Sequence, residues 1–106
     1  MIPEIHYVPN VGSYDEAERD DDGALRFGET HCAEEIWYWY ATGDYCGGGV
    51  AILRGGDGRW GVAGLSHCSC NGPWDNDVTW HPSLAALRSK EGADDAACLF
   101  AVIGDR

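Results

Sequence analysis

Positive charge is scarce in this sequence. Seven Lys and Arg residues stand against eighteen Asp and Glu residues in a chain of 106, which gives a formal net charge of −11 at pH 7. Proteins bind nucleic-acid backbones and anionic membrane surfaces through clustered Lys and Arg, so this deficit argues against both kinds of partner. A strongly acidic protein is attracted instead to a positively charged partner, and that attraction speeds their encounter.

Long apolar runs and targeting signals are lacking as well. No segment approaches the roughly 20 consecutive apolar residues of a membrane-spanning helix. The chain starts Met-Ile-Pro-Glu-Ile-His, which has neither the basic region nor the apolar core of a secretory signal. We therefore expect a cytoplasmic protein, in which the five cysteines are thiols or metal ligands rather than a disulfide framework.

The length of the chain predicts one domain, residues 1–106, around a single core. Segments rich in aromatic and β-branched residues predict three antiparallel strands, at 36–42, 49–54 and 59–65. The glycines at 47–49 separate the first two strands. The turn Gly55-Gly56-Asp57-Gly58 favours a tight hairpin, because Gly and Asp-Gly tolerate the positive φ values of such turns. We expect a small antiparallel β-meander over about 36–65.

The flanking segments add further strands and helices to this expectation. Residues 3–9 and 78–80 predict short strands, and 82–90 predicts a helix that ends at Gly92. The apolar run 96–103 fits either a buried strand or a buried helix, because periodicity does not separate the two. The predicted fold class is therefore α+β, an antiparallel meander with one or two helices packed on it.

Acidic residues are densest in the N-terminal segment, residues 1–30, which holds eight acidic and two basic residues and is expected to be partly irregular. Within it, residues 12–23 predict an acidic loop or a short helical turn. The field of a charge is screened within about 8–10 Å at physiological salt, so a mimic of nucleic acid needs clustered carboxylates. The candidate partner-binding residues are Asp15, Glu16, Glu18, Asp20, Asp21, Asp22 and Glu29, and Glu34, Glu35 and Asp44 are further candidates for the same cluster. The alternative is that the acid only keeps the protein soluble.

The string His67-Cys68-Ser69-Cys70 places three potential metal ligands at the end of a predicted strand. Zinc prefers nitrogen and thiolate ligands, usually four in a tetrahedron. The candidate zinc ligands are His67, Cys68, Cys70 and, as the fourth, Cys46, with Cys32, His31 and His81 as alternatives for the fourth position. A lone Cys-x-Cys pair is a weaker signal than paired zinc knuckles, so thiols without chemistry are the competing interpretation.

The same cysteines allow an enzymatic interpretation, with Cys68 or Cys70 as a nucleophile. A thiolate beside an imidazolium reacts at neutral pH, although acidic surroundings disfavour the thiolate form. Glu34 and Glu35, together with Asp44, are further candidates for paired carboxylates. We interpret these residues as solvated strand ends rather than as acid–base machinery.

The stretch from Trp37 to Trp74 resembles a group of small proteins of no known function that are found mainly in phages and prophages. The shared features are an aromatic strand, a Gly-rich strand, a short hairpin, and a strand ending in a Gly-His-Cys-Ser-Cys-Tyr-Gly-Pro-like motif. The matching residues are Trp37, Tyr38, Trp39, Tyr40, Gly43, Tyr45, Gly47 to Val50, Asp57, Gly58, Trp60, Leu65, His67 to Cys70, Gly72 and Pro73. Ser66 and Asn71 depart from the motif, and we expect the relatives to carry an acidic residue where this chain has Cys46.

The resemblance implies an accessory protein of a phage or mobile element, located in the cytoplasm of a host cell. Together with the charge, it predicts a small acidic interaction protein that binds and modulates a host protein with a basic surface. Nucleic-acid mimicry is one route to such binding. The alternatives are the thiol enzyme and a structural accessory protein of a phage particle.

Overall fold

The computed structural model describes residues 2–9, 16–17, 19–43, 46–67, 74, 76–91 and 94–104. Its strands are β1 (Glu4–Tyr7), β2 (Glu16–Ala17), β3 (Ala33–Gly43), β4 (Cys46–Gly55), β5 (Trp60–His67) and β6 (Thr79–His81). Its helices are α1 (Asp21–Thr30), α2 (Leu84–Glu91) and α3 (Asp94–Ile103). No helix among the described residues is long and apolar enough to cross a membrane.

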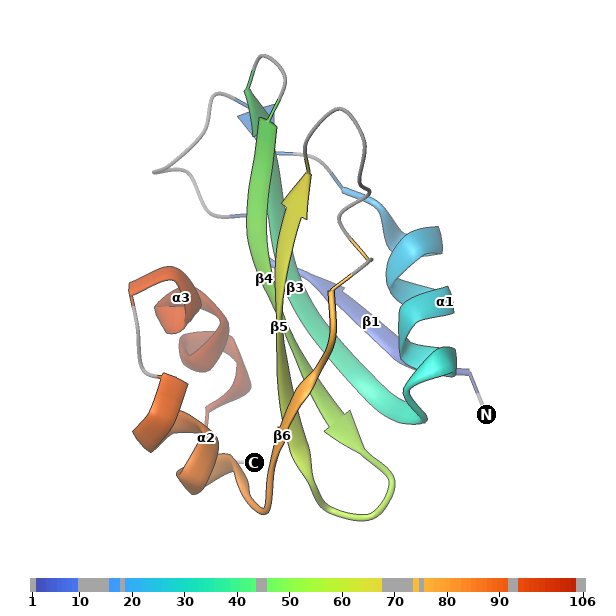
Figure 1. Cartoon of the computed structure of the whole chain (residues 1–106), viewed down its shortest axis with the longest axis vertical. Helices are drawn as coiled ribbons and strands as arrows, with labels where there is room; N and C mark the ends of the chain where they lie inside the picture. The colour runs from blue at the N-terminus through green and yellow to red at the C-terminus, as the bar shows by residue number, and fades with distance from the viewer. Residues whose placement is uncertain are drawn as a thin grey trace.

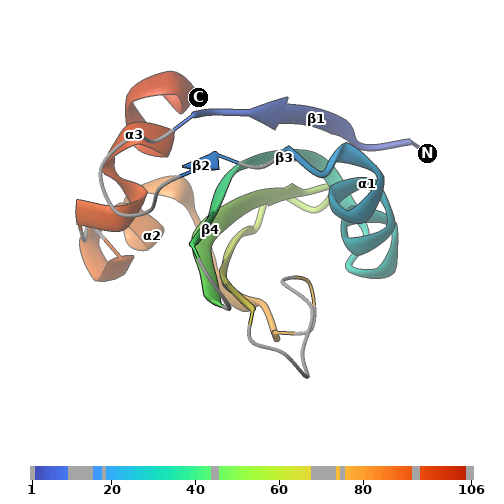
Figure 2. The same ribbon diagram turned by 90° about the horizontal axis from the view of Figure 1, so that it is seen from above.

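The strands form one sheet in the order β1-β3-β4-β5-β6, and β2 pairs with β3 beyond the end of β1. All pairings are antiparallel except that of β1 with β3. Figures 1 and 2 show α1 on one side of the sheet and the α2–α3 pair on the other. The predicted α+β class and the three-stranded meander are confirmed.

Two hydrophobic cores lie on the two faces of the sheet, because successive side chains of a strand point to opposite faces. On one face, Tyr38 and its neighbours on β3 pack with Phe27 of α1. On the other face, Trp37 packs with Leu87 of α2 and Leu99 of α3. Trp37 also stacks on Trp60 of β5, with the ring centroids 5.6 Å apart. The aromatic run on β3 therefore supplies both cores, as expected for a strand buried on both faces.

The glycines at 47–49 lie inside β4, whereas the sequence pattern predicted a break there. Gly49 pairs with Tyr40 on one side and with Leu65 on the other. A Cβ atom at Gly49 would collide with the main-chain carbonyl oxygen of Trp39. Here glycine allows two strands to approach closely and does not end a strand.

Helix α1 overlaps the predicted loop or short helical turn only at residues 21–23 and continues to Thr30, where no helix was predicted, while residues 12–15 and 18 lie outside the described residues. The helix begins at Asp21, and Asp20 is its N-cap: Asp20 Oδ1 accepts a hydrogen bond from the Gly23 N–H at 3.1 Å. Asp20 Oδ2 also accepts a hydrogen bond from the indole N–H of Trp74 at 2.9 Å. Glycines within α1 lower its helix propensity, so the sequence pattern did not indicate a helix. Packing of Phe27 in the core stabilises the helix instead.

The apolar run 96–103 lies within α3, so it forms a helix and not a strand. Arg88 of α2 donates a hydrogen bond to the carbonyl of Gly104, just after α3. Its guanidinium also lies 5.4 Å from the centroid of the Phe100 ring. These contacts tie α2 to α3, so the two helices cover their face of the sheet together.

The hydroxyl of Tyr38 links the start of α1 to β3, and its removal gives a testable prediction. Tyr38 accepts a hydrogen bond from the Asp20 N–H at 2.7 Å and donates one to Asp21 Oδ1 at 2.8 Å. Because Tyr38→Phe leaves these groups unpaired, we expect it to lower the free energy of unfolding by about 1–2 kcal/mol at pH 7. Urea unfolding followed by tryptophan fluorescence measures this loss.

The same variant has a signature at high pH. Burial, together with the hydrogen bond to Asp21, raises the pKa of Tyr38 well above its usual value. The folded state therefore keeps Tyr38 neutral while the unfolded state ionises above pH about 10, so this stabilisation is full below pH 10 and is lost as the pH rises. We expect the difference between wild type and Tyr38→Phe to shrink at high pH, and a constant difference would contradict this account.

Candidate functional site

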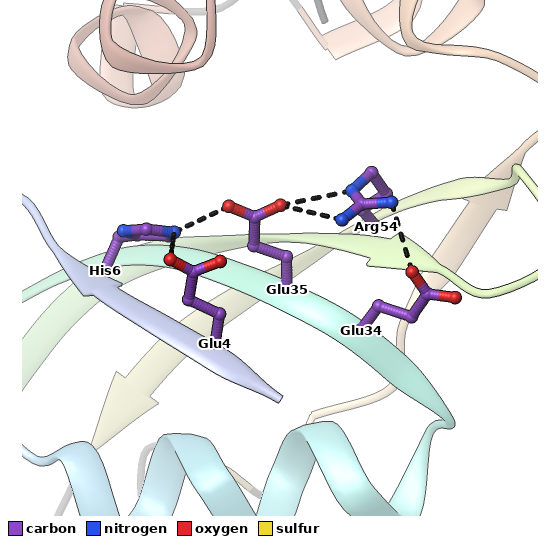
Figure 3. Close-up of polar contacts among 5 residues, drawn as sticks. All are labelled: Glu4, His6, Glu34, Glu35 and Arg54. Carbon is purple, nitrogen blue, oxygen red and sulfur yellow. Dashed lines mark hydrogen bonds and ion pairs between the residues drawn. The ribbon is translucent and has the colours of Figure 1, made fainter. Parts of the chain in front are cut away.

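The candidate functional site begins with a network of charged side chains at the β1 edge of the sheet, formed by Glu4, His6, Glu34, Glu35 and Arg54 (Figure 3). We call this set the Glu35 network. Parallel pairing places Glu4 of β1 opposite Glu35 of β3, and His6 opposite Trp37. The His6 ring stacks on Trp37, with centroids 5.2 Å apart and an angle of 16° between the rings. This stacking holds the imidazole beside Glu35.

Glu35 is the centre of the network and accepts hydrogen bonds on both of its oxygens. Its Oε2 lies 2.6 Å from His6 Nε2. Its Oε1 accepts hydrogen bonds from two nitrogens of Arg54, Nη2 at 2.9 Å and Nε at 3.2 Å. The carboxylate is therefore held between an imidazole and a guanidinium, a charge-assisted geometry that fixes its orientation.

A β-bulge brings a second carboxylate to the same guanidinium. The β3–β4 register shifts between Ala33 and Glu35, so that Glu34 is an extra residue in β3. Glu34 Oε2 lies 3.2 Å from Arg54 Nη1. One guanidinium thus serves two adjacent carboxylates.

The interpretation of Glu34 and Glu35 as a solvated strand end is wrong for Glu35. The side chain of Glu35 is only 1% exposed, whereas those of Glu34 and Arg54 are about one-third exposed. Glu35 is two residues before Trp37 in β3, so the two side chains lie on the same face of the sheet, and the side chain of Glu35 is buried there. A partial signal was present in the sequence, because the predicted meander makes the strand that carries Arg54 a neighbour of the strand next to Glu35, although the predicted break at 47–49 left the register open. The contribution of His6 had no such signal, because it depends on parallel pairing between distant segments.

An open pocket of about 380 Å³ lies next to the network and is lined by Glu29, Cys32, Ala33, Glu34 and Gly56. We call it the acidic pocket. A smaller pocket of about 190 Å³ shares Cys32 and Gly56 with it and extends past Asp57 and Arg59 to Trp80. Glu34 belongs both to the acidic pocket and to the Glu35 network, so Arg54 helps to hold a carboxylate at the pocket wall.

The end of α1 adds negative potential to the acidic pocket. The last turn of α1 carries no basic side chain, and Glu29 lies within it. The C-terminal end of a helix is the negative end of its dipole. Cys32, with a free and exposed thiol, follows the helix in a left-handed conformation with φ of 56° that turns the chain into β3. The pocket therefore combines two carboxylates with a helix end of the same sign.

The predicted zinc ligands are only partly within the described structure. Cys68 and Cys70 lie outside the described residues. The backbone of His67 ends β5, and that of Cys46 begins β4, where the neighbouring Gly47 pairs with His67. The chain thus brings the positions of Cys46 and His67 to the same end of the sheet. Zinc binding there stays a prediction.

The predicted partner-binding acids have different surroundings. Asp15 and Glu18 lie outside the described residues, and Glu16 is placed on β2. Asp20 and Asp21 serve the fold: Asp20 caps α1, and a hydrogen bond from Arg19, together with one from Tyr38, lowers the pKa of Asp21. Asp22 is exposed in the first turn of α1. Among the described acids of the run 15–22, only Asp22 therefore has a described side chain that is exposed and not used by the fold, and the candidate Glu29 is exposed near the end of α1.

The sequence matches no family model, and it matches neither a curated protein nor a solved structure.

Proposed function

We propose that this protein is a small interaction module that binds a positively charged segment of a partner protein at the acidic pocket. The observation that carries the proposal is the pairing of Glu29 and Glu34 in one open pocket at the negative end of α1. A Lys or Arg side chain of a partner would place its charge between these carboxylates. The net charge of −11 would steer such a partner toward the protein.

The resemblance to phage proteins makes a protein of the host cell the expected partner, and the cytoplasm the expected compartment. Electrostatic attraction of this kind gives binding that weakens as salt rises. The partner would contact Glu29 and Glu34 and not Asp20 and Asp21, because the fold already uses the carboxylates of Asp20 and Asp21. If the protein mimics a nucleic acid, the carboxylates of the acidic pocket and the acidic side chains near it would take the place of the phosphates.

A labelled oligoarginine peptide is a suitable probe for this proposal. Fluorescence anisotropy should show binding to the wild-type protein that weakens as salt is raised. We expect the double variant Glu29→Gln/Glu34→Gln to bind about tenfold more weakly, which corresponds to about 1.4 kcal/mol. Glutamine keeps the size of each side chain and a hydrogen-bond acceptor for Arg54, so the thermal unfolding temperature should change little.

The matched control removes the same amount of charge elsewhere. Asp22 and Asp77 are both exposed and lie outside the acidic pocket. The variant Asp22→Asn/Asp77→Asn should bind the peptide within roughly twofold of wild type. Equal losses in the two double variants would mean that only the overall charge attracts the peptide, and the acidic pocket would then have no specific role.

A further inference from the structure

The Glu35 network contains three side chains of metal-binding type whose ligand atoms converge. The carboxylate oxygens of Glu4 and Glu35 and the imidazole nitrogen of His6 lie within 4.8 Å of one another. His6 Nε2 is 2.6 Å from Glu35 Oε2 and 3.7 Å from Glu4 Oε1. We propose that Glu4, His6 and Glu35 bind a divalent transition-metal ion of the zinc type, with Arg54 as a positioning residue.

The geometry needs only a small adjustment to admit the ion. A zinc ion about 2.0–2.2 Å from each ligand atom holds neighbouring ligand atoms roughly 3.3 Å apart. The gap between His6 and Glu35 would widen by less than about 1 Å as the ion replaces the proton shared across their hydrogen bond. Glu4 is 68% exposed and can close on the ion from the solvent side. Three protein ligands then leave a coordination position open to water.

The charge of the network favours a cation at this point. Glu4, Glu34 and Glu35 are three carboxylates, and Arg54 contacts two of them, Glu34 and Glu35. Arg54 is divided between Glu34 and Glu35, and it contacts only one oxygen of Glu35. The other oxygen of Glu35, Oε2, lies in a side chain that is 1% exposed and faces His6. A buried carboxylate requires compensating positive charge, and a metal ion between Glu35 Oε2 and His6 Nε2 would supply it on that side.

The remaining contacts are those that metal sites use to hold their ligands. Two hydrogen bonds from Arg54 hold Oε1 of Glu35 in place, and stacking on Trp37 holds the His6 ring. Outer contacts of this kind orient metal ligands and tune their affinity. Imidazole and carboxylate ligands together suit zinc, cobalt and related divalent ions rather than calcium.

This site is separate from the zinc site predicted at His67, Cys68 and Cys70, and from the acidic pocket. The variant Cys68→Ser/Cys70→Ser removes the thiolates of the predicted site and leaves the Glu35 network intact. After chelation and dialysis, this variant should still bind one equivalent of Zn²⁺ in calorimetry. Bound Co²⁺ should give visible absorption without the near-ultraviolet charge-transfer band of a cobalt–thiolate bond.

Substitution of the ligands tests the assignment. Because Glu4 is exposed and lies at the sheet edge, Glu4→Gln should leave the unfolding temperature unchanged and weaken Zn²⁺ binding about tenfold. His6→Gln should abolish Zn²⁺ binding. The control Glu29→Gln removes an equal charge outside the network and should bind Zn²⁺ as the parent variant does.

Two results would overturn the inference. One is a Cys68→Ser/Cys70→Ser variant that binds no Zn²⁺ at submillimolar concentration. The other is unchanged Zn²⁺ affinity in Glu4→Gln, a variant expected to fold normally, which would place any bound ion elsewhere. Peptide binding at the acidic pocket is measured without metal, so failure of the metal site and failure of the proposed function can be told apart.

Discussion

Replacing Arg54 with methionine is expected to lower the free energy of unfolding by about 3–5 kcal/mol. Methionine keeps the apolar length of the side chain but removes both hydrogen bonds to Glu35 Oε1. The carboxylate of Glu35 is 1% exposed, so water cannot replace these donors without opening the structure. Breaking a buried ion pair by removing one partner is costly because an uncompensated charge remains. Urea unfolding followed by tryptophan fluorescence measures the change.

Arg59 provides a matched control for this substitution. Arg59 pairs with Asp57 at 2.6 Å, but both side chains are more than half exposed. Arg59→Met should therefore cost about 1 kcal/mol or less. Adding Glu35→Gln to the Arg54→Met variant should restore part of the lost stability, because a neutral amide is less costly to bury than a carboxylate. An Arg54→Met variant as stable as Arg59→Met would contradict the buried-charge account.

Replacing Gly49 with alanine is expected to lower the free energy of unfolding by about 3 kcal/mol. The added methyl group would collide with the carbonyl oxygen of Trp39 and approach the Cα of Tyr40. Both contacts are with the backbone of β3, which cannot rotate away as a flexible side chain can. The β3–β4 pairing at the centre of the sheet would have to open locally. Denaturant unfolding measures this loss of stability.

Gly64 is the matched control, because it lies on the next strand of the same sheet. An added Cβ atom at Gly64 meets no heavy atom within 4 Å. Gly64→Ala should change the stability by no more than about 0.5 kcal/mol. Similar losses in both variants would mean that strand propensity, and not the contact with Trp39, explains the glycine at position 49.

The meander could be predicted from the sequence because its signals are local. Aromatic and β-branched residues over 36–42 and 59–65 favour strands, and the turn at Gly55–Gly58 fixes how the last two strands pair. The register between β3 and β4, which places Arg54 opposite Glu35, was not predicted, because the glycines at 47–49 indicated a break where β4 in fact continues. The acidic character of the protein and the scarcity of basic residues were evident from composition alone.

Helix α1 and helix α3 were decided by tertiary packing. The pattern in α1 is interrupted by glycines, and its stability comes from Phe27 against the sheet and from the cap at Asp20. The run 96–103 is apolar on all sides, so its sequence alone fits a strand or a helix equally well. As a helix, this segment packs Leu99 and Ile103 in the same core as Trp37.

The candidate site depends on the tertiary structure for a physical reason. His6 and Glu35 are 29 residues apart and meet only because β1 pairs in parallel with β3, a pairing that no local signal specifies. The acidic pocket likewise joins the end of α1 to the β4–β5 turn. The sequence by itself determined the charge of the protein and its central strands, since both depend on composition and on neighbouring residues. The tertiary structure decided which carboxylate is buried and which carboxylates line a pocket, because burial depends on contacts between distant segments.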